Sequence, residues 1–278
     1  MSVRIDSHQH FWLYNSEDYP WMDESRAALK VDYQPPDLEP LLAATGIHGT
    51  VAVQARQIVY ETEYLLELAD QFDFVRGVVG WVDMRADDVE AQLEQFASHP
   101  RMVGVRHIVH DEVDDRFMLG GNFLRGLTKL KAYDLAYDLL LFPRHLPIAI
   151  NVVQQFPHQR FVLDHIAKPF IKDGILEPWA SDIRRLAAFG NVWCKVSGMV
   201  TEAAWGAWSQ DDYGPYLDVV FECFGADRLM FGSDWPVCTL SGSYSEVVGI
   251  VENYIAALSA DEQAKIMGGV AVDFYQLP

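Results

Sequence analysis

The chain has 278 residues, 50% of them apolar, and a formal net charge of −19. A chain of this length can bury enough surface to be stable without disulfide bonds or a structural metal, so a cluster of metal-binding residues would be functional. The strong negative charge, with no run of Lys or Arg, predicts that neither nucleic acid nor an anionic membrane surface is a partner.

The cysteines and the N-terminal residues indicate the compartment. Cys194, Cys223 and Cys238 form no spacing pattern, which favours free thiols in a reducing environment over a disulfide framework. The N-terminus has no apolar signal core, and no apolar run reaches the roughly 18 residues of a membrane span. We therefore expect a cytoplasmic protein, by elimination. The sequence leaves open whether the chain forms a homo-oligomer.

Short apolar runs recur along the whole chain. Most are continuously apolar, which is typical of strands buried on both faces in a parallel sheet. In chain order, the expected strands are Val3–Asp6, Thr50–Ala55, Val75–Val82, Met102–Val109, Asp134–Phe142, Arg160–His165, Asn191–Ser197 and Arg228–Asp234.

Segments with helical spacing of apolar residues lie between these runs. The expected helices include Asp37–Thr45, which ends at the stop signal Gly46, and Glu61–Phe72, Val89–Phe96, Ile183–Phe189, Tyr216–Phe224 and Val247–Leu258. Because strand and helix alternate throughout, the sequence predicts a (β/α)₈ TIM barrel that forms a single domain over residues 1–278. A dinucleotide-binding sheet is disfavoured, since no Gly-x-Gly-x-x-Gly follows the first strand.

Two connections are too long for a bare barrel. Phe11–Tyr33, which is aromatic and acidic, follows the first strand, and Lys168–Trp179 follows the sixth. Both would leave the carboxyl ends of strands, where barrel enzymes form their active sites. We expect them to act as lids or substrate walls.

A pair of histidines closes the first strand. His8 and His10 are two residues apart, so they share one face of a strand and could bind one divalent ion together. The alternative is one buried, hydrogen-bonded histidine and one exposed histidine.

Ionisable residues also follow the sixth and eighth strands. His165 comes directly after an apolar run, although a histidine there could equally be a satisfied core residue. Asp234 ends the last run and is costly to bury without a partner. Its alternative role is the N-cap of a helix in which Pro236 occupies the first turn.

Weaker candidates complete the ring of strand ends. Arg106 and His107 end the fourth strand and Asp138 lies in the fifth; structural pairing is at least as good an interpretation for each. Three tryptophans near strand ends could stack on sugar rings or could be core packing; they are Trp12, Trp81 and Trp235.

Taken together and in order, these motifs resemble the amidohydrolase superfamily, in particular the branch that includes the sugar-lactone hydrolases. The resemblance covers essentially the whole chain. The motifs that carry it are Asp6-Ser-His-Gln-His-Phe-Trp12, Gly104-Val-Arg-His107, Leu163-Asp-His-Ile-Ala-Lys-Pro169, Phe231-Gly-Ser-Asp-Trp-Pro236 and the final segment Met267–Tyr275.

The resemblance implies a function and roles for named residues. It implies that water opens a sugar lactone to the aldonic acid, with Asp234 as general base. His165, Arg106 and His107 would serve catalysis at the pocket. The sugar would contact Trp12, Gln54, Trp81, Asp138, Lys168 and Trp235.

The resemblance also implies a metal site. One divalent ion, with zinc expected, would be bound by His8, His10, His165 and Asp234, and the resemblance leaves open whether catalysis requires it. A binuclear site is not expected, because no obvious carboxylated lysine is present. The fifth strand offers no histidine either, only Tyr137 and Asp138 as inward candidates.

Two other functions stay open at this point. A metal-dependent decarboxylase of the same superfamily would share the patterns of the first and eighth strands, but it needs basic residues for a substrate carboxylate, and these are scarce. A catalytically silent barrel that only binds a ligand is the second alternative, against which the polar motifs at the strand ends argue.

Overall fold

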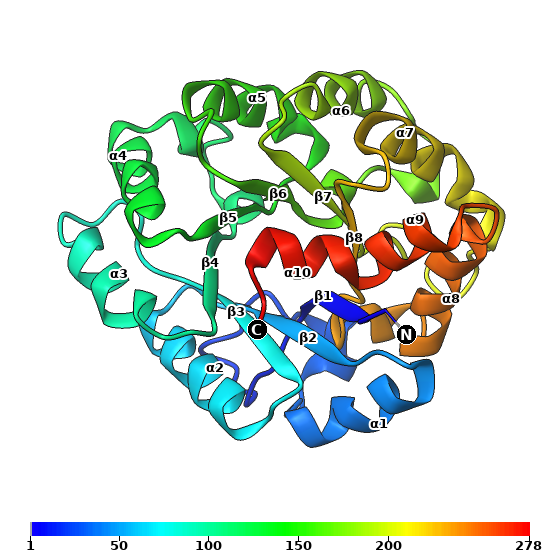
Figure 1. Cartoon of the computed structure of the whole chain (residues 1–278), viewed down its shortest axis with the longest axis horizontal. Helices are drawn as coiled ribbons and strands as arrows, with labels where there is room; N and C mark the ends of the chain where they lie inside the picture. Colours follow the sequence, from blue (N-terminus) through cyan, green and yellow to red (C-terminus); the bar gives the residue numbers. More distant parts are fainter. Residues whose placement is uncertain (1) are drawn as a thin grey trace.

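The structure, a computed structural model that describes residues 2–278, contains eight parallel strands hydrogen-bonded in chain order (Figure 1). The strands are β1 (Ile5–Gln9), β2 (Gly49–Val53), β3 (Val75–Gly80), β4 (Met102–His107), β5 (Ala136–Leu139), β6 (Phe161–Leu163), β7 (Val192–Val196) and β8 (Leu229–Phe231). Their bounds differ by a few residues from the expected apolar runs, because each run extends into the loop that carries its polar end.

Backbone hydrogen bonds close the sheet into a ring. The amide of Asp234 donates to the carbonyl of His8 over 2.8 Å, and the amide of His10 donates to that of Trp235 over 2.7 Å. The segment after β8 is thereby joined to the end of β1. The predicted barrel is confirmed, and its closure places the first and last motifs of the sequence side by side.

A helix follows each strand and covers the outside of the ring (Figure 1). The helices are α1 (Pro35–Thr45), α2 (Val59–Gln71), α3 (Val89–Ala97), α4 (Gly121–Leu130), α5 (Leu146–Gln155), α6 (Trp179–Ala187), α7 (Gly214–Phe224), α8 (Tyr244–Ile255), α9 (Ala260–Ala264) and α10 (Val270–Tyr275). Helix α1 ends as predicted, since Gly46 adopts the left-handed conformation at its C-cap.

The helix α10 closes one end of the barrel. In Figure 1 it lies across the middle of the ring of strands. It packs against inward side chains from the amino ends of the strands, all of them apolar. This inner cluster comprises Ile5, Val51, Val53, Val79, Val103, Ala136, Val162 and Met230 from the strands and Val270, Ala271, Phe274, Tyr275 and Leu277 from the chain end.

The next inward layer, towards the carboxyl ends, is polar. Asp138, Asp164 and Lys195 each stand two residues beyond an inward residue of β5, β6 or β7, so they share its face. All three are fully buried. Of the two inward candidates on β5, Asp138 points into the barrel, whereas Tyr137 packs in the outer core between strands and helices.

Four long connections rise above the carboxyl ends of the strands. Residues 10–34 after β1 and 164–178 after β6 were expected from the sequence; residues 108–120 after β4 and 197–213 after β7 were not. No helix among residues 2–278 combines the length and the apolar character that crossing a membrane requires. The three cysteines are free thiols, as predicted.

Candidate active site

A cavity of about 380 Å³ opens at the carboxyl ends of the strands. The expected lids line it through Trp21, Arg26 and Lys168, and the unexpected loops through Ile108, His110, Asp111, Thr201, Glu202 and Trp205. The strand ends and remaining walls contribute His10, Ala55, Arg106, Leu140, Phe142, His165, Asp234, Val237 and Leu240.

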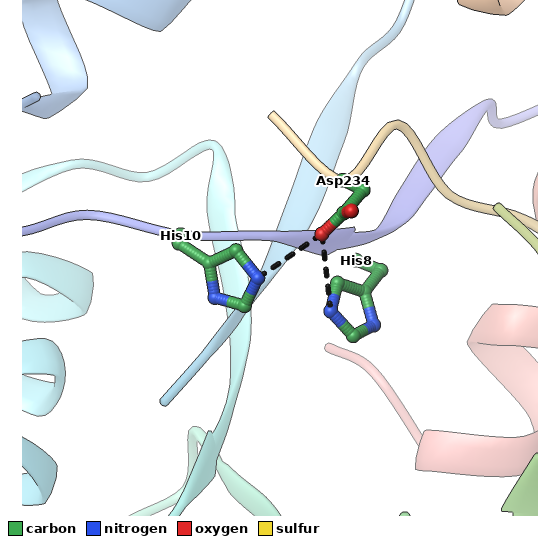
Figure 2. A group of neighbouring side chains, drawn as sticks. All are labelled: His8, His10 and Asp234. Carbon is green, nitrogen blue, oxygen red and sulfur yellow. Dashed lines mark hydrogen bonds and ion pairs between the residues drawn. The ribbon is translucent and has the colours of Figure 1, made fainter. Parts of the chain in front are cut away.

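Three imidazoles surround one carboxylate at the floor of this cavity. The Oδ1 atom of Asp234 lies 3.2 Å from Nε2 of His10, 3.8 Å from Nε2 of His8 and 3.7 Å from Nε2 of His165. Figure 2 shows the rings of His8 and His10 turned towards the same oxygen. The N-cap alternative for Asp234 is therefore wrong, because its side chain faces the histidines and the following helical turn, Val237–Leu240, has no side-chain cap.

The buried carboxylate of Asp6 holds the first and last motifs in register. It accepts hydrogen bonds from the backbone amides of His8 and Ser233, at 3.1 and 2.8 Å, and from the hydroxyl of Tyr244 at 3.0 Å. A residue from β1 thus fixes the backbone on either side of the ring closure. Asp6 belongs to the first sequence motif, but no role was expected of it from the sequence.

The loop after β6 presents His165 from an unusual backbone. His165, Ile166, Ala167 and Lys168 all have positive φ angles, at 54°, 47°, 61° and 49°. Non-glycine residues rarely adopt this conformation, and a run of them is a form of strain found at functional sites. Gly198, also at positive φ, allows the ring to lie there, because a Cβ atom at this position would come within 2.5 Å of Nδ1 of His165.

The hydrogen bonds of His10 indicate that its ring could bind a metal. Its Nδ1 lies 2.7 Å from the carbonyl oxygen of Val53, which can only accept, so Nδ1 carries the hydrogen. In a neutral ring Nε2 then has a lone pair, yet it faces a carboxylate oxygen at 3.2 Å. Two acceptors at this distance fit a cation between them, and a histidine bonded to a backbone carbonyl in this way is typical of metal ligands.

The donor set also suits a divalent metal. One ligand atom each from His8, His10 and Asp234 lies within 4.8 Å of the others, and all three residues are buried. Two imidazole nitrogens and a carboxylate are ligands that zinc accepts. The expected fourth ligand, His165, belongs to a separate group with His8 and Asp164.

Below the cavity, the polar layer forms a continuous network of buried charges. Nη1 of Arg106 lies 3.0 Å from Asp164 and 3.1 Å from Nε2 of His8. Nζ of Lys195 lies 2.5 Å from Asp138 and 3.1 Å from Asp164. The two cations and two carboxylates balance one another, as buried charges must.

Burial sets the protonation of the central groups. Burial lowers the pKa of His165 to about 3 and holds that of His8 well below its ordinary value. For Asp234, burial alone would raise the pKa, but its contacts with His165 and His10 more than offset this and lower it. At neutral pH the floor of the cavity therefore holds an ionised carboxylate beside uncharged His8 and His165 rings.

Five of the six expected sugar contacts do not reach the cavity. Trp12 is fully buried, and its indole nitrogen donates to the carbonyl of Val31 at 2.9 Å. It packs with Tyr19, Met22 and Leu29, because the aromatic segment after β1 folds onto itself. Trp235 is also buried, in edge contact with the rings of Phe11 and Tyr33.

The other three serve the surrounding framework. Gln54 is buried and donates to the carbonyl of Arg106 at 3.2 Å, and Asp138 pairs with Lys195. The indole nitrogen of Trp81 donates to Nδ1 of His107 at 3.2 Å, outside the cavity wall. Of the expected sugar contacts, Lys168 alone lines the cavity among the residues that the structure describes.

His107, an expected catalytic residue, does not line the cavity either. Its Nε2 lies 2.7 Å from Glu112, and its ring stacks on Phe117 with centroids 4.5 Å apart. Both partners belong to the loop after β4. His107 therefore supports that loop from behind, which corrects its expected place beside the substrate.

Several residues of the site were missed. Lys195 is buried in the middle of β7, and its one signal was a charged residue inside an apolar run. His110, Glu202 and Trp205 lie on connections for which no lid was expected. The long polar segments between predicted strand and helix at these two places were the available signal.

Comparison with known proteins places the chain among hydrolases. The profile of the amidohydrolase family matches residues 5–277. An L-fucono-1,5-lactonase from Burkholderia multivorans is 41% identical over 288 residues, covering 100% of this chain and 97% of that protein. An L-fucono-1,5-lactonase from Burkholderia ambifaria is 38% identical over 284 residues, with coverage of 100% and 97%.

A solved structure is also similar to this chain over its whole length. The crystal structure of an amidohydrolase from Burkholderia multivorans with bound zinc superimposes with a TM-score of 0.96 at 41% sequence identity. The alignment covers 100% of both chains. The structural similarity therefore extends over the whole length of the chain.

Proposed function

This chain belongs to the amidohydrolase family, and on that premise we propose that it hydrolyses a sugar-derived lactone to the aldonic acid. The observation that carries the proposal is an ionised carboxylate, that of Asp234, surrounded by imidazoles at the floor of an open cavity, in a chain that aligns end to end with two lactonases. A cavity of about 380 Å³ is within the range that accommodates small-molecule ligands.

Asp234 is the general base in this proposal. Water attacks the carbonyl carbon of the lactone, its proton passes to Asp234, and a tetrahedral oxyanion forms. When the ring C–O bond breaks, the leaving alkoxide takes the proton back from Asp234. The lowered pKa of Asp234 supports this role because the carboxylate is ionised before substrate arrives.

Polar groups around the carboxylate would stabilise the oxyanion. Arg106 and His165 line the cavity beside Asp234, and the guanidinium is a permanent cation. Donors already held in place by the protein stabilise developing charge without reorganisation. Arg106 is held in this way by Asp164 and by the backbone carbonyl of Gln54.

A metal would add to the same step. The residues that would bind it are His8, His10 and Asp234, and zinc is the expected ion because the similar Burkholderia multivorans amidohydrolase contains it. Bound there, a zinc ion would supply Lewis acidity for the ester carbonyl. Water activation and proton return remain the work of Asp234.

The walls of the cavity would bind the sugar. Lys168 and Glu202 form an ion pair of 3.0 Å within the wall, so each could hydrogen-bond a hydroxyl. Trp21 and Trp205 bring aromatic rings to the same cavity, and Trp205 is 41% exposed. These two tryptophans take the stacking role that we had expected of Trp12, Trp81 and Trp235.

The decarboxylase alternative is less well supported. A substrate carboxylate would need an unpaired cation in the cavity. Each cavity cation instead has a carboxylate close by: Arg26 has Asp23 at 2.7 Å, Arg106 has Asp164 at 3.0 Å, and Lys168 has Glu202 at 3.0 Å.

A pH-indicator assay tests the proposal directly. We expect the purified chain to release acid from L-fucono-1,5-lactone or another aldonolactone, with and without chelator, and Asp234→Asn to reduce the rate to near background. As a matched control, Asp218→Asn changes a carboxylate that accepts from the hydroxyl of Tyr254 at 2.7 Å on the outer helices, and it should retain the rate. Absence of hydrolysis across an aldonolactone panel, or release of CO₂ from aromatic carboxylic acids, would contradict the proposal.

A further inference from the structure

Charged side chains of both signs line the cavity. Among the residues that the structure describes, the cations are Arg26, Arg106 and Lys168, and the carboxylates are Asp111, Glu202 and Asp234. All of them reach the space in which a substrate would bind. The way in which they are paired therefore decides which charges on a substrate the cavity accepts.

Two of the cations have partners outside the cavity. Nη1 of Arg106 lies 3.0 Å from Oδ2 of Asp164. Nη1 of Arg26 lies 2.7 Å from Oδ2 of Asp23. Neither Asp164 nor Asp23 lines the cavity, so a ligand in the cavity does not take the place of either carboxylate. These two guanidinium groups remain paired when a ligand binds.

Lys168 differs because its partner lies inside the cavity wall. Its Nζ atom is 3.0 Å from Oε1 of Glu202, and the two side chains are 13% and 22% exposed. Burial alone would lower the pKa of Lys168, but the carboxylates of Glu202 and Asp234 more than offset this and raise it. The ammonium is therefore charged, and Glu202 is the carboxylate in contact with it.

The backbone of two loops fixes this ion pair before a ligand arrives. Lys168 lies in the loop after β6, and Glu202 lies in the loop after β7. The carbonyl of Glu202 accepts from the amide of Lys172 at 3.0 Å, which ties the second loop to the first. The pair is thus preorganised on both sides of the cavity wall.

We propose that Glu202 is a specificity-determining residue, which restricts the cavity to lactones without a carboxylate substituent because it pairs with Lys168. The inference rests on the proposed lactone hydrolysis and narrows its substrate class. A sugar hydroxyl can donate to Glu202 and accept from Lys168 at the same time. Neutral hydroxylated lactones therefore suit this wall.

An anionic substituent would meet the opposite situation. It would enter a cavity that holds the carboxylates of Asp111, Glu202 and Asp234, and each cation of the described lining already has a carboxylate partner. A carboxylate that leaves water without gaining a partner is strongly disfavoured. The net charge of −19 acts in the same direction, since it repels anions that approach the protein.

Loss of the charge on Glu202 should weaken this selectivity. In Glu202→Gln the ammonium of Lys168 lacks its carboxylate, and a carboxylate on the substrate could replace it. A hydrogen bond between charged groups contributes about 10- to 100-fold in affinity. If Glu202 merely supported its loop, the substitution would weaken neutral and anionic ligands alike.

The test compares two lactones that differ at one carbon. L-galactono-1,4-lactone ends in a hydroxymethyl group, and L-galactaro-1,4-lactone has a carboxylate in its place. Their affinities are measured as inhibition of L-fucono-1,5-lactone hydrolysis and, independently of turnover, by isothermal titration calorimetry. The matched control is Asp111→Asn, which also removes one negative charge from the cavity lining but leaves the pair of Lys168 and Glu202 in place.

We expect the parent to bind the neutral lactone about 100-fold more tightly than the anionic one. Glu202→Gln should reduce this ratio to about 10-fold or less and bind the neutral lactone about 3-fold more weakly, because a charged acceptor is lost. Addition of Lys168→Met to Glu202→Gln should abolish the gain in affinity for the anionic lactone. Asp111→Asn should keep the ratio within about 3-fold of the parent.

Equal affinity of the parent for the two lactones would overturn the proposal. A ratio that Glu202→Gln leaves unchanged, or that Asp111→Asn reduces as much, would also overturn it. If Glu202→Gln does not fold, Lys168→Met decides, since it leaves Glu202 unpaired and should widen the ratio; an unchanged ratio would then count against the proposal. A parent that discriminates in calorimetry but hydrolyses no lactone would instead contradict the proposed function and leave the role of Glu202 intact.

Discussion

The two ends of the barrel differ sharply, although the same strands supply both. At the amino end, Val162 and Trp193 belong to the apolar cluster under α10. Two residues further along the same strands, Asp164 and Lys195 enter a network of buried charges. One end is closed and apolar, and the other opens into a cavity lined by ionisable groups.

This difference separates stability from activity. Burial of apolar side chains under α10 contributes free energy of folding without any geometric demand beyond good packing. Burial of charges at the carboxyl end has a desolvation free energy that the interactions with their partners do little more than offset. We therefore infer that the charged residues at this end are retained for their chemistry. Substitutions at the carboxyl end should therefore change rates, and substitutions at the amino end should change stability.

The largest effect is expected at Asp234. Asp234→Asn removes the proposed base while preserving shape, and loss of a positioned base costs on the order of 1000-fold in kcat. The midpoint of urea denaturation should fall modestly, because the lowered pKa of Asp234 means that its ionised carboxylate stabilises the folded state. Steady-state hydrolysis of an aldonolactone and equilibrium unfolding measure the two quantities. Parent-like turnover would mean that another group activates the water.

The opposite response is expected at Phe274 on α10. This side chain is 3% exposed and lies against Trp193, with ring centroids 5.0 Å apart. Phe274→Ala should lower the free energy of unfolding by about 3–5 kcal/mol and leave kcat nearly unchanged. Phe274→Leu, which fills most of the space, should lose much less. A large loss of kcat in folded Phe274→Ala would show that the two ends are coupled.

The third substitution, at Glu61, tests whether stability at the carboxyl end depends on pH. Glu61, fully buried after β2, accepts from the amides of Ala55 and Arg56, yet burial raises its pKa from 4.5 to about 7. Between these values the folded state holds a proton that the unfolded state has lost, so the contribution of Glu61 to stability decreases as pH rises. Below pH 4.5 the neutral acid resembles glutamine, and Glu61→Gln should match the parent.

Above pH 7 the parent must bury a charge, so Glu61→Gln should be the more stable protein. A shift of this size corresponds to at most about 3 kcal/mol. Urea denaturation of both proteins across the pH range measures the difference. A difference that does not vary with pH would mean that Glu61 is already ionised in the folded protein at low pH.

The fold and the centre of the site were predictable because strong local patterns encode them. Continuous apolar runs marked the buried strands, and the polar residue ending each run led to His8, His10, His165 and Asp234. Barrel closure then explains how residues from both ends of the chain meet. The barrel and the family are confirmed; the catalytic roles and the extent of the single domain stay predictions.

The second layer was harder to predict for physical reasons. Lys195 lies within β7 between Cys194 and Val196, and nothing in its immediate sequence tells which carboxylates of other strands will pair with it. Trp12 shows the converse: an aromatic residue after a strand has the same local sequence whether it faces a cavity or folds beneath its own loop. Both outcomes depend on contacts between segments far apart in the chain.

A smaller effect on rate is expected at Gly198. Gly198 has a positive φ of 62°, and a Cβ atom added there would lie 2.5 Å from Nδ1 of His165, so the site has no room for a methyl group. Gly198→Ala should push the imidazole away from Asp234 and lower kcat about 10- to 100-fold, as small misplacements at a reaction centre do. Gly206→Ala is the matched control, since this glycine also has positive φ, at 68°, but has nothing within 4 Å of the added carbon. Equal losses of activity would point to backbone strain rather than displacement of His165.

The smallest effect is expected at the rim, from Trp205. Its indole nitrogen donates to the carbonyl of Thr201 at 2.9 Å, which fixes the ring while 41% of the residue stays exposed at the cavity. If a sugar ring stacks there, Trp205→Ala should raise KM about 3- to 10-fold with little change in kcat, because a stacking contact of about 1 kcal/mol acts on substrate and transition state alike. Trp205→Phe keeps an aromatic face and should recover most of the affinity, whereas Tyr60→Ala, 61% exposed on α2, should change nothing. A fall in kcat at constant KM would instead mean that Trp205 contacts the transition state. The residues that act in catalysis would then extend from the cavity floor around Asp234 to the rim.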